Sequence, residues 1–304
     1  MKPNDFRLHH RLRVRWAEVD MQKIVFNAHY LMYFDTAVTD YWRALALPYE
    51  EAMVQLGGEL YVKKASVEYH GSARFDDWLD VALKCHRIGS SSMVFTGAIF
   101  KDEALLITCE LVYVFADPAS QTSRPVPQGL RSLVARFEAG EPVVAVKLGE
   151  WPELGPAATS IRMAAFVQAQ GIALECQEDA ADGSAVYAVA FNALEQAIGT
   201  GQLDCREKGS GTISRLTVHR ALRGEGIGKA ILDTLVNAAR QRGDAAVMLQ
   251  AQRSAIGFYL HQGFVARGEP FMKAGISLQE MFKPLKGSRS HERHNSFGVA
   301  MSSA

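Results

Sequence analysis

The sequence lacks three features that would assign it quickly to a functional class. Lysines and arginines number 33 and acids also number 33, so the composition offers no electrostatic case for binding nucleic acid or an anionic membrane. No apolar run is long enough to span a bilayer, and the first residues, MKPNDFRLHH, contain no apolar core of a secretory signal. These absences predict a cytoplasmic protein, and without a basic recognition helix they disfavour a DNA-binding regulator.

Cysteine is also scarce and scattered. The chain has four cysteines and no Cys-x-x-Cys pair, so neither a disulfide framework nor a zinc site is indicated. We expect buried thiols in a reducing compartment and no bound metal; the cysteines are Cys85, Cys109, Cys176 and Cys205.

What the chain does have is enough apolar material for two domains. It contains 304 residues, of which 48% are apolar, and this length favours about two domains. An alternating strand at 11–16 and a long helical pattern at 26–47 are followed by at least four strands with short turns, up to residue 117. This order predicts an antiparallel sheet packed on one helix.

The second half reads as a mixed α/β unit. A Gly- and Pro-containing segment at 139–158 is predicted to be a linker, and a polar, aperiodic stretch at 287–304 is predicted to be a disordered tail. We therefore expect domains at 1–138 and 159–286. The expected helices and strands of the second domain are a helix from 160 to 171, strands at 184–192 and 212–218, a helix at 227–240, a strand at 245–251 and a helix at 254–263.

A glycine-rich stretch, RLTVHRALRGEGIGKAILDTL at 215–235, lies between a predicted strand and a predicted helix. Backbone amides at such a junction bind anions. A Walker A loop requires Ser or Thr after the lysine, but Ala230 follows Lys229. A Rossmann loop requires an acid about 20 residues on, and the next strand instead ends near Gln250. A coenzyme A site is the remaining candidate.

The string Arg223-x-x-Gly226-x-Gly228 resembles the signature loop of the GNAT (GCN5-related N-acetyltransferase) superfamily. Three further stretches agree in the right order, and the resemblance covers roughly residues 160–285. The stretches are IRMAAFVQAQGI, ISRLTV and LQAQRSAIGFYLHQGF.

This resemblance implies that acetyl-CoA binds at the loop. Backbone amides would hold its pyrophosphate, and the strand edge from Leu216 to Val218 would bond the pantetheine arm. Tyr259 matches the tyrosine that protonates the leaving thiolate, a role that suits a phenol; its alternative is an ordinary core tyrosine. The residues expected to supply the amides are Arg223, Gly224, Glu225, Gly226, Ile227 and Gly228.

The second half also departs from the family. Lys273 stands where the nearest subgroup has an acid, and Leu278 where it has a histidine. No general base for the amine can be identified, because Glu175 and Glu207 are candidates by residue type alone. Acetyl-CoA binding is therefore better supported than acetyl transfer.

The first half carries a second resemblance, on the stretch VRWAEVDMQKIVFNAHYLMYFDTA at 14–37. Its strand, Asp-x-x-x-hydrophobic-Val loop and aromatic-rich helix resemble the hydroxybenzoyl-CoA-type thioesterases of the hotdog fold. The likeness extends over about residues 8–136. The residues that fall on the pattern are Asp20, Ile24, Val25, Phe26 and Tyr30.

This resemblance implies thioester hydrolysis. Asp20 would act as general base or nucleophile, and the backbone amide at Asn27 would polarise the thioester carbonyl with help from the helix dipole. Asn27 is also a good N-cap by type, and an isolated Asp20 would read as a solvated loop acid. Lys23 replaces the family's glycine, so we expect either a different loop bend or a cation beside the carboxylate.

The sequence thus predicts an α+β chain, in which a hotdog domain precedes a GNAT mixed α/β domain. Its expected activities are acyl-CoA hydrolysis and acetyl-CoA-dependent N-acetyl transfer to an unknown amine, without a metal. By resemblance, the hotdog domain implies at least a dimer. Two alternatives stay open: the GNAT domain only senses acetyl-CoA, or the hotdog domain only binds acyl-CoA.

Overall fold

The computed structural model describes residues 1–164, 185–204, 209–273 and 275–285. The chain divides into two compact units, Met1–Gln202 with Arg215–Leu235, and Leu203–Ser214 with Val236–Ala304. Among the described residues, no helix is long and apolar enough to cross a membrane. The predicted tail at 287–304 and most of the helix predicted from 160 to 171 lie outside the described residues.

The first half forms an antiparallel sheet of five strands in the order β1-β3-β4-β5-β2. Each neighbouring pair is antiparallel, as the sequence predicts. Strand β1 begins and ends three residues earlier than expected. The strands are β1 (Leu8–Arg13), β2 (Glu59–Tyr69), β3 (Trp78–Ile88), β4 (Ser92–Lys101) and β5 (Ala104–Ala116).

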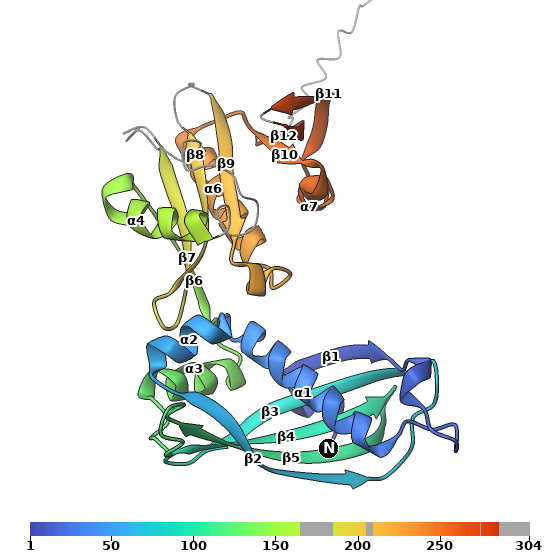
Figure 1. The fold of residues 1–304 in the computed structure, drawn as a ribbon. Coiled ribbons are helices and arrows are strands. Elements are labelled where there is room, and N and C mark those ends of the chain that lie inside the picture. The colour runs from blue at the N-terminus through green and yellow to red at the C-terminus, as the bar shows by residue number, and fades with distance from the viewer. Residues whose placement is uncertain (165–184, 205–208, 274, 286–304) are drawn as a thin grey trace, which may run out of the picture. The chain divides into compact units, whose positions relative to one another are not determined.

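Helix α1 (Asn27–Ala44) lies along this sheet (Figure 1). Its apolar residues recur at helical spacing and are buried, including the predicted face of Tyr30, Phe34, Val38 and Tyr41. Gly97 of β4 allows the close approach, because a Cβ at this position would overlap the Phe34 ring. The short helices α2 (Tyr49–Leu56) and α3 (Gln128–Glu138) follow α1 and β5 in the chain.

The second half contains a seven-stranded sheet in the order β11-β12-β10-β9-β8-β7-β6. Strands β9 and β10 are parallel, whereas the pairs β10–β12, β11–β12 and β6–β7 are antiparallel. The strands are β6 (Val144–Gly149), β7 (Val186–Asn192), β8 (Ala197–Asp204), β9 (Ser210–Val218), β10 (Ala246–Gln252), β11 (Val265–Lys273) and β12 (Ile276–Pro284).

The α-helices among the described residues of this half are α4 (Trp151–Arg162), α6 (Ile227–Arg242) and α7 (Ile256–His261). Glycines of β8 make room for α6, because a Cβ at Gly199 or Gly201 would press on Ile231 of that helix. The segment 139–158, predicted to be a linker, contains regular structure. Strand β6 pairs with β7 and α4 begins at Trp151, so much of the segment belongs to regular structure.

Candidate functional sites

The loop that carries Asp20 is closed by backbone bonds. Val19 and Val25 form an antiparallel bridge, and the amide of Asp20 donates to the carbonyl of Ile24 over 2.9 Å. The Asp20 carboxylate accepts a 2.8 Å hydrogen bond from the amide of Gln22. The half-buried Asp20 is therefore held in a defined turn, with one of its two carboxylate oxygens bonded to the chain.

Lys23 fits this turn in an uncommon conformation. Its φ is 61°, in the left-handed region that glycine adopts without strain. The lysine thus holds a backbone conformation that glycine adopts readily. Its side chain is exposed, and within the described ranges it forms no ion pair with Asp20.

Helix α1 starts directly after this loop, with its N-terminal amides uncapped by any side chain. Phe26 is the N-cap residue, and Asn27 is the first helical residue. The expectation of Asn27 as the N-cap residue was wrong, because Phe26 occupies that position and Asn27 is one residue further along the chain. The amide of His29 donates to the carbonyl of Phe26 over 2.9 Å, whereas the amides of Asn27 and Ala28 precede any possible intrahelical acceptor. The amide of Asn27 can therefore donate to an oxyanion.

An apolar groove lies beside the first turns of α1. Its volume is about 270 Å³, and several of its apolar side chains are exposed, including Leu31, Met32 and Val62. The sequence prediction missed these residues, although apolar residues on the helix face opposite the buried one are a detectable signal. The groove is lined by Ala28, Leu31, Met32, Asp35, Val62, Ala65, Leu111 and Tyr113.

The glycine loop precedes α6, as predicted. Gly224 has φ 99° and Gly226 has φ 78°, so both adopt a conformation that is strained for residues with a Cβ. The amide of Ala230 makes the first helical bond, to the carbonyl of Gly226 over 3.0 Å. The amides preceding Ala230 at the start of α6 therefore lack an intrahelical partner, and together with the helix dipole they suit an anion.

Strand β9, which precedes this loop, has a backbone irregularity near its middle. Arg215 has φ 56°, an irregularity within the strand, and the parallel ladder with β10 covers only Ser210–Thr212. In the described part of the chain, the ladder does not reach the half-buried residues Leu216 and Val218. Their backbone is therefore not bonded to β10 and suits pairing with an extended ligand.

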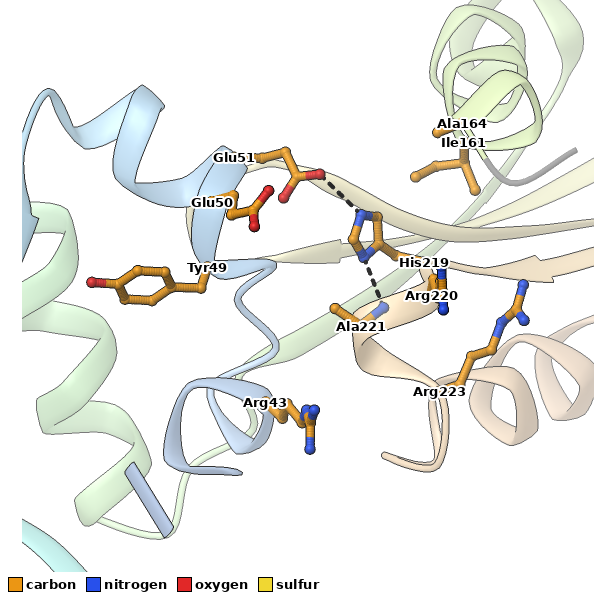
Figure 2. A pocket seen from close by; sticks show the side chains of 10 residues that line it. All are labelled: Arg43, Tyr49, Glu50, Glu51, Ile161, Ala164, His219, Arg220, Ala221 and Arg223. Atoms are coloured by element: carbon orange, nitrogen blue, oxygen red, sulfur yellow. Dashed lines mark hydrogen bonds and ion pairs between the residues drawn. The ribbon is translucent and has the colours of Figure 1, made fainter. Parts of the chain in front are cut away.

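A pocket of about 780 Å³ within the first unit adjoins the glycine loop. Figure 2 shows His219 between Glu51, to which its Nε2 lies at 3.3 Å, and the amide of Ala221, which donates to its Nδ1. Three arginines make part of the lining positively charged, which suits phosphate groups. The lining residues are Arg43, Tyr49, Glu50, Glu51, Ile161, Ala164, His219, Arg220, Ala221 and Arg223.

Tyr259 lies on α7 and is 8% exposed. Its ring packs edge-to-face on Phe258 and Phe264, with centroids 5.0 and 5.7 Å away. Burial raises the pKa of Tyr259 to about 12, which keeps the phenol protonated at neutral pH. It can therefore donate a proton but is a poor base.

The residues that depart from the GNAT pattern offer no replacement base. Lys273 Nζ lies 3.5 Å from the side-chain oxygen of Gln250, and Leu278 pairs with Gln252 across β12 and β10. Glu175 and Glu207 lie outside the described residues. Within the described ranges, no group of three or more His, Cys, Asp or Glu side chains is arranged to hold a metal ion.

Comparisons with known proteins identify both halves. A model of the thioesterase-like superfamily matches residues 14–134, and a model of the acetyltransferase (GNAT) domain matches residues 158–285. The chain belongs to both families and is a fusion of a hotdog thioesterase-like domain with a GNAT domain. Both resemblances seen in the sequence are confirmed.

Individual relatives each match one half. The chain is 30% identical over 128 residues to the acyl-CoA thioester hydrolase YbgC of Escherichia coli O6:H1, covering 42% of this chain and 92% of that protein. It is 29% identical over 124 residues to the uncharacterized N-acetyltransferase YjcF of Bacillus subtilis, covering 40% of this chain and 87% of that protein.

A solved structure also matches the first half. It is the 1,4-dihydroxy-2-naphthoyl-CoA thioesterase Slr0204 of Synechocystis, with 16% identity and a TM-score of 0.40. The alignment covers 43% of this chain and 97% of that one.

Proposed function

We propose that the hotdog domain hydrolyses acyl-CoA thioesters and that the GNAT domain transfers an acetyl group from acetyl-CoA to an amine. The observation that carries the first activity is the juxtaposition of the Asp20 turn with the uncapped start of α1. The bridge between Val19 and Val25 joins the two in one short loop. A carboxylate and a free amide are what thioester hydrolysis requires.

In the proposed hydrolysis, the amide of Asn27 binds the thioester carbonyl oxygen. Asp20 accepts a proton from water while the water oxygen bonds to the carbonyl carbon, and the carbon–sulfur bond then breaks to release CoA thiolate and the acid. A direct attack by Asp20 is the alternative, in which water hydrolyses the resulting mixed anhydride. Both routes depend on the same two groups.

The acyl group would occupy the apolar groove beside α1, which begins next to Asn27 at Ala28. A second copy of the chain is expected to complete this site. Strand β2 is an outer edge of its sheet and exposes Val62 and Tyr69, and an exposed apolar edge favours pairing with another chain. We therefore propose at least a dimer through the hotdog domain.

In the GNAT domain, the amides from Arg223 to Gly228 would bind the pyrophosphate of acetyl-CoA. The backbone of Leu216 and Val218 would pair with the pantetheine arm, and Tyr259 would protonate the departing thiolate. The order of these elements in the chain and the free amides at the start of α6 support this proposal. The amine acceptor and its base are left open.

The sequence places the domain limits at 1–138 and 159–286, and we propose that the second domain also includes β6, because β6 pairs with β7. A cytoplasmic location is proposed with them, because Cys85 and Cys109 are buried free thiols of the kind found in reducing compartments. Two narrower functions compete with the proposal. Either the GNAT domain only senses acetyl-CoA, as the substitutions at Lys273 and Leu278 suggest, or the hotdog domain only binds acyl-CoA, as Lys23 suggests.

One experiment separates these possibilities. Thiol release is measured from short, long and aromatic acyl-CoAs, with and without amine acceptors, for the wild type and Asp20→Asn. We expect acceptor-independent release that falls ~100-fold or more in Asp20→Asn, while acceptor-dependent release is retained. Release that always requires an acceptor and survives the Asp20 change would make the hotdog domain a binding module.

A further inference from the structure

A buried carboxylate lies under the Asp20 loop and takes no part in the proposed chemistry. Glu18 ends the short 3₁₀ helix η2 (Trp16–Glu18) and is only 3% exposed. Its carboxylate accepts a 2.8 Å bond from the amide of Arg15, a 2.7 Å bond from Arg15 Nε and a further bond from Arg15 Nη2. It also accepts a 2.7 Å bond from the hydroxyl of Tyr33.

Burying a carboxylate is costly unless it is fully bonded. Burial by itself raises the pKa of Glu18, but the bonds from Arg15 and Tyr33 more than offset it, and the net effect lowers the pKa. Burial and the neighbouring Glu18 raise the pKa of Tyr33. At neutral pH the pair is therefore a neutral phenol that donates to a charged carboxylate, which is a strong type of hydrogen bond.

Glu18 joins the loop to α1 at two points. Its side chain holds Tyr33, in the second turn of the helix, and its backbone carbonyl accepts a 2.9 Å bond from the amide of Phe26, the residue before the helix. Two residues after Glu18 comes Asp20. One residue thus links the proposed base, the start of α1 and the body of α1.

A second tyrosine of α1 holds the other side of the loop. The hydroxyl of Tyr30 accepts a 2.9 Å bond from the amide of Ala73, and the carbonyl of Ala73 accepts a 2.9 Å bond from the amide of Val25. The loop is therefore bonded to α1 through two tyrosine side chains, of which only Tyr33 meets a buried charge.

We propose that Glu18, through its bond with Tyr33, is a positioning residue that sets the Asp20 carboxylate against the first amides of α1. This inference rests on the proposed thioester hydrolysis. Glu18 is not itself catalytic, because it is buried and its carboxylate oxygens are already bonded within the chain. The bond between Glu18 and Tyr33 acts through the loop. It fixes the distance between the Asp20 carboxylate and the amide of Asn27, which must both reach the same thioester carbonyl.

The same helix offers a matched control. The hydroxyl of Tyr41 donates a 2.6 Å bond to Glu138, whose Oε1 also accepts a 2.8 Å bond from the amide of Cys85. This is another tyrosine–glutamate bond of α1, in which Tyr41 is buried and Glu138, the last residue of α3, is half-buried. Tyr41 lies eight residues beyond Tyr33, ~12 Å along the helix axis, and among the described residues the pair has no bond to the Asp20 loop.

The test compares Tyr33→Phe with Tyr41→Phe in the full chain. Hexanoyl-CoA and benzoyl-CoA serve as probes for hydrolysis, and amide hydrogen exchange serves as a readout independent of activity. We expect Tyr33→Phe to lower kcat ~10-fold with little change in KM, and to speed exchange of the amides from 19 to 29. Tyr41→Phe should leave both kcat and the exchange of the amides from 19 to 29 unchanged, even if it lowers the thermal stability as much as Tyr33→Phe does.

Glu18→Gln is the conservative variant. Its side-chain oxygen can still accept from Tyr33, so kcat should fall less than in Glu18→Ala. Equal kcat and equal exchange in residues 19–29 for the two tyrosine variants would overturn the inference. If Asp20→Asn abolishes hydrolysis while Tyr33→Phe changes neither readout, only the positioning role fails. If Asp20→Asn is fully active, the proposed function itself fails.

Discussion

Helices α1 and α6 both begin with amides that lack an intrahelical acceptor, and the segments that lead into them differ. Helix α1 follows a turn that carries Asp20 and is anchored by the buried carboxylate of Glu18. Helix α6 follows a loop whose shape comes from the positive φ angles of Gly224 and Gly226. The segment before α1 is held by backbone bonds and by the buried side chain of Glu18, and the segment before α6 takes its shape from the backbone conformation of its glycines.

The difference matches what each helix is proposed to bind. A thioester carbonyl is neutral and needs one amide, with a carboxylate at a fixed distance, so the α1 entry must be rigid and must carry a functional side chain. A pyrophosphate is charged on several oxygens and needs several amides that can approach closely, which is consistent with glycine at positions 224, 226 and 228 of the segment before α6. The two sites share helix physics but depend on different residue types.

Among the variants that would test the comparison between the two sites, the largest effect is expected at Tyr259. It is the one side chain proposed to act chemically in the GNAT domain. Tyr259→Phe should lower acceptor-dependent acetyl transfer ~100-fold and leave hydrolysis by the hotdog domain unchanged. Because burial raises the pKa of Tyr259 to about 12, the wild-type transfer rate should show no decline from this group until the pH approaches that value. A variant with unchanged transfer would assign Tyr259 to the core alone.

A smaller effect is expected at the α6 entry. Gly226→Ala places a Cβ at φ 78°, which strains the loop and displaces the amides, so acetyl-CoA should bind ~10-fold more weakly. Binding is measured by calorimetry in an Asp20→Asn background, which suppresses hydrolysis. Gly243→Ala is the control, because Gly243 has φ 89° at the other end of α6; equal weakening by both variants would contradict a phosphate role for the loop.

The smallest effect is expected at the α1 entry. Lys23→Gly relieves a positive φ of 61°, but it also raises the entropy of the unfolded chain, so stability should rise by no more than ~1 kcal/mol. Asp102→Gly, at φ 53° in the β4–β5 turn, should behave similarly in urea unfolding. A marked loss of hydrolysis in Lys23→Gly alone would show that the lysine side chain, rather than its backbone, serves the site.

Much of the fold could be predicted from local patterns, and the failures have physical reasons. Helix α1 is predicted by apolar residues at helical spacing, and the predicted start at residue 26 is within one residue of the observed start at Asn27. Strand β8 was not predicted because Gly199 and Gly201 have low strand propensity. These glycines are nevertheless required, because a Cβ at either position would press on Ile231 of α6. Strand β6 was missed because neighbouring Gly and Pro suggested a linker, whereas pairing with β7 makes it a strand.

The sequence by itself determined the two families, the order of their elements and the positions of Asp20, Tyr259 and the glycine loop, because these follow from local spacing along the chain. Only the tertiary structure decided that Glu18 is buried against Tyr33 and that Asn27 is a first-turn residue rather than a cap. Burial and bonding depend on residues brought together by folding, and Glu18 and Tyr33 are 15 positions apart in the chain. From the sequence alone, Glu18 would be interpreted as a solvated acid, because its bonding partners are not apparent.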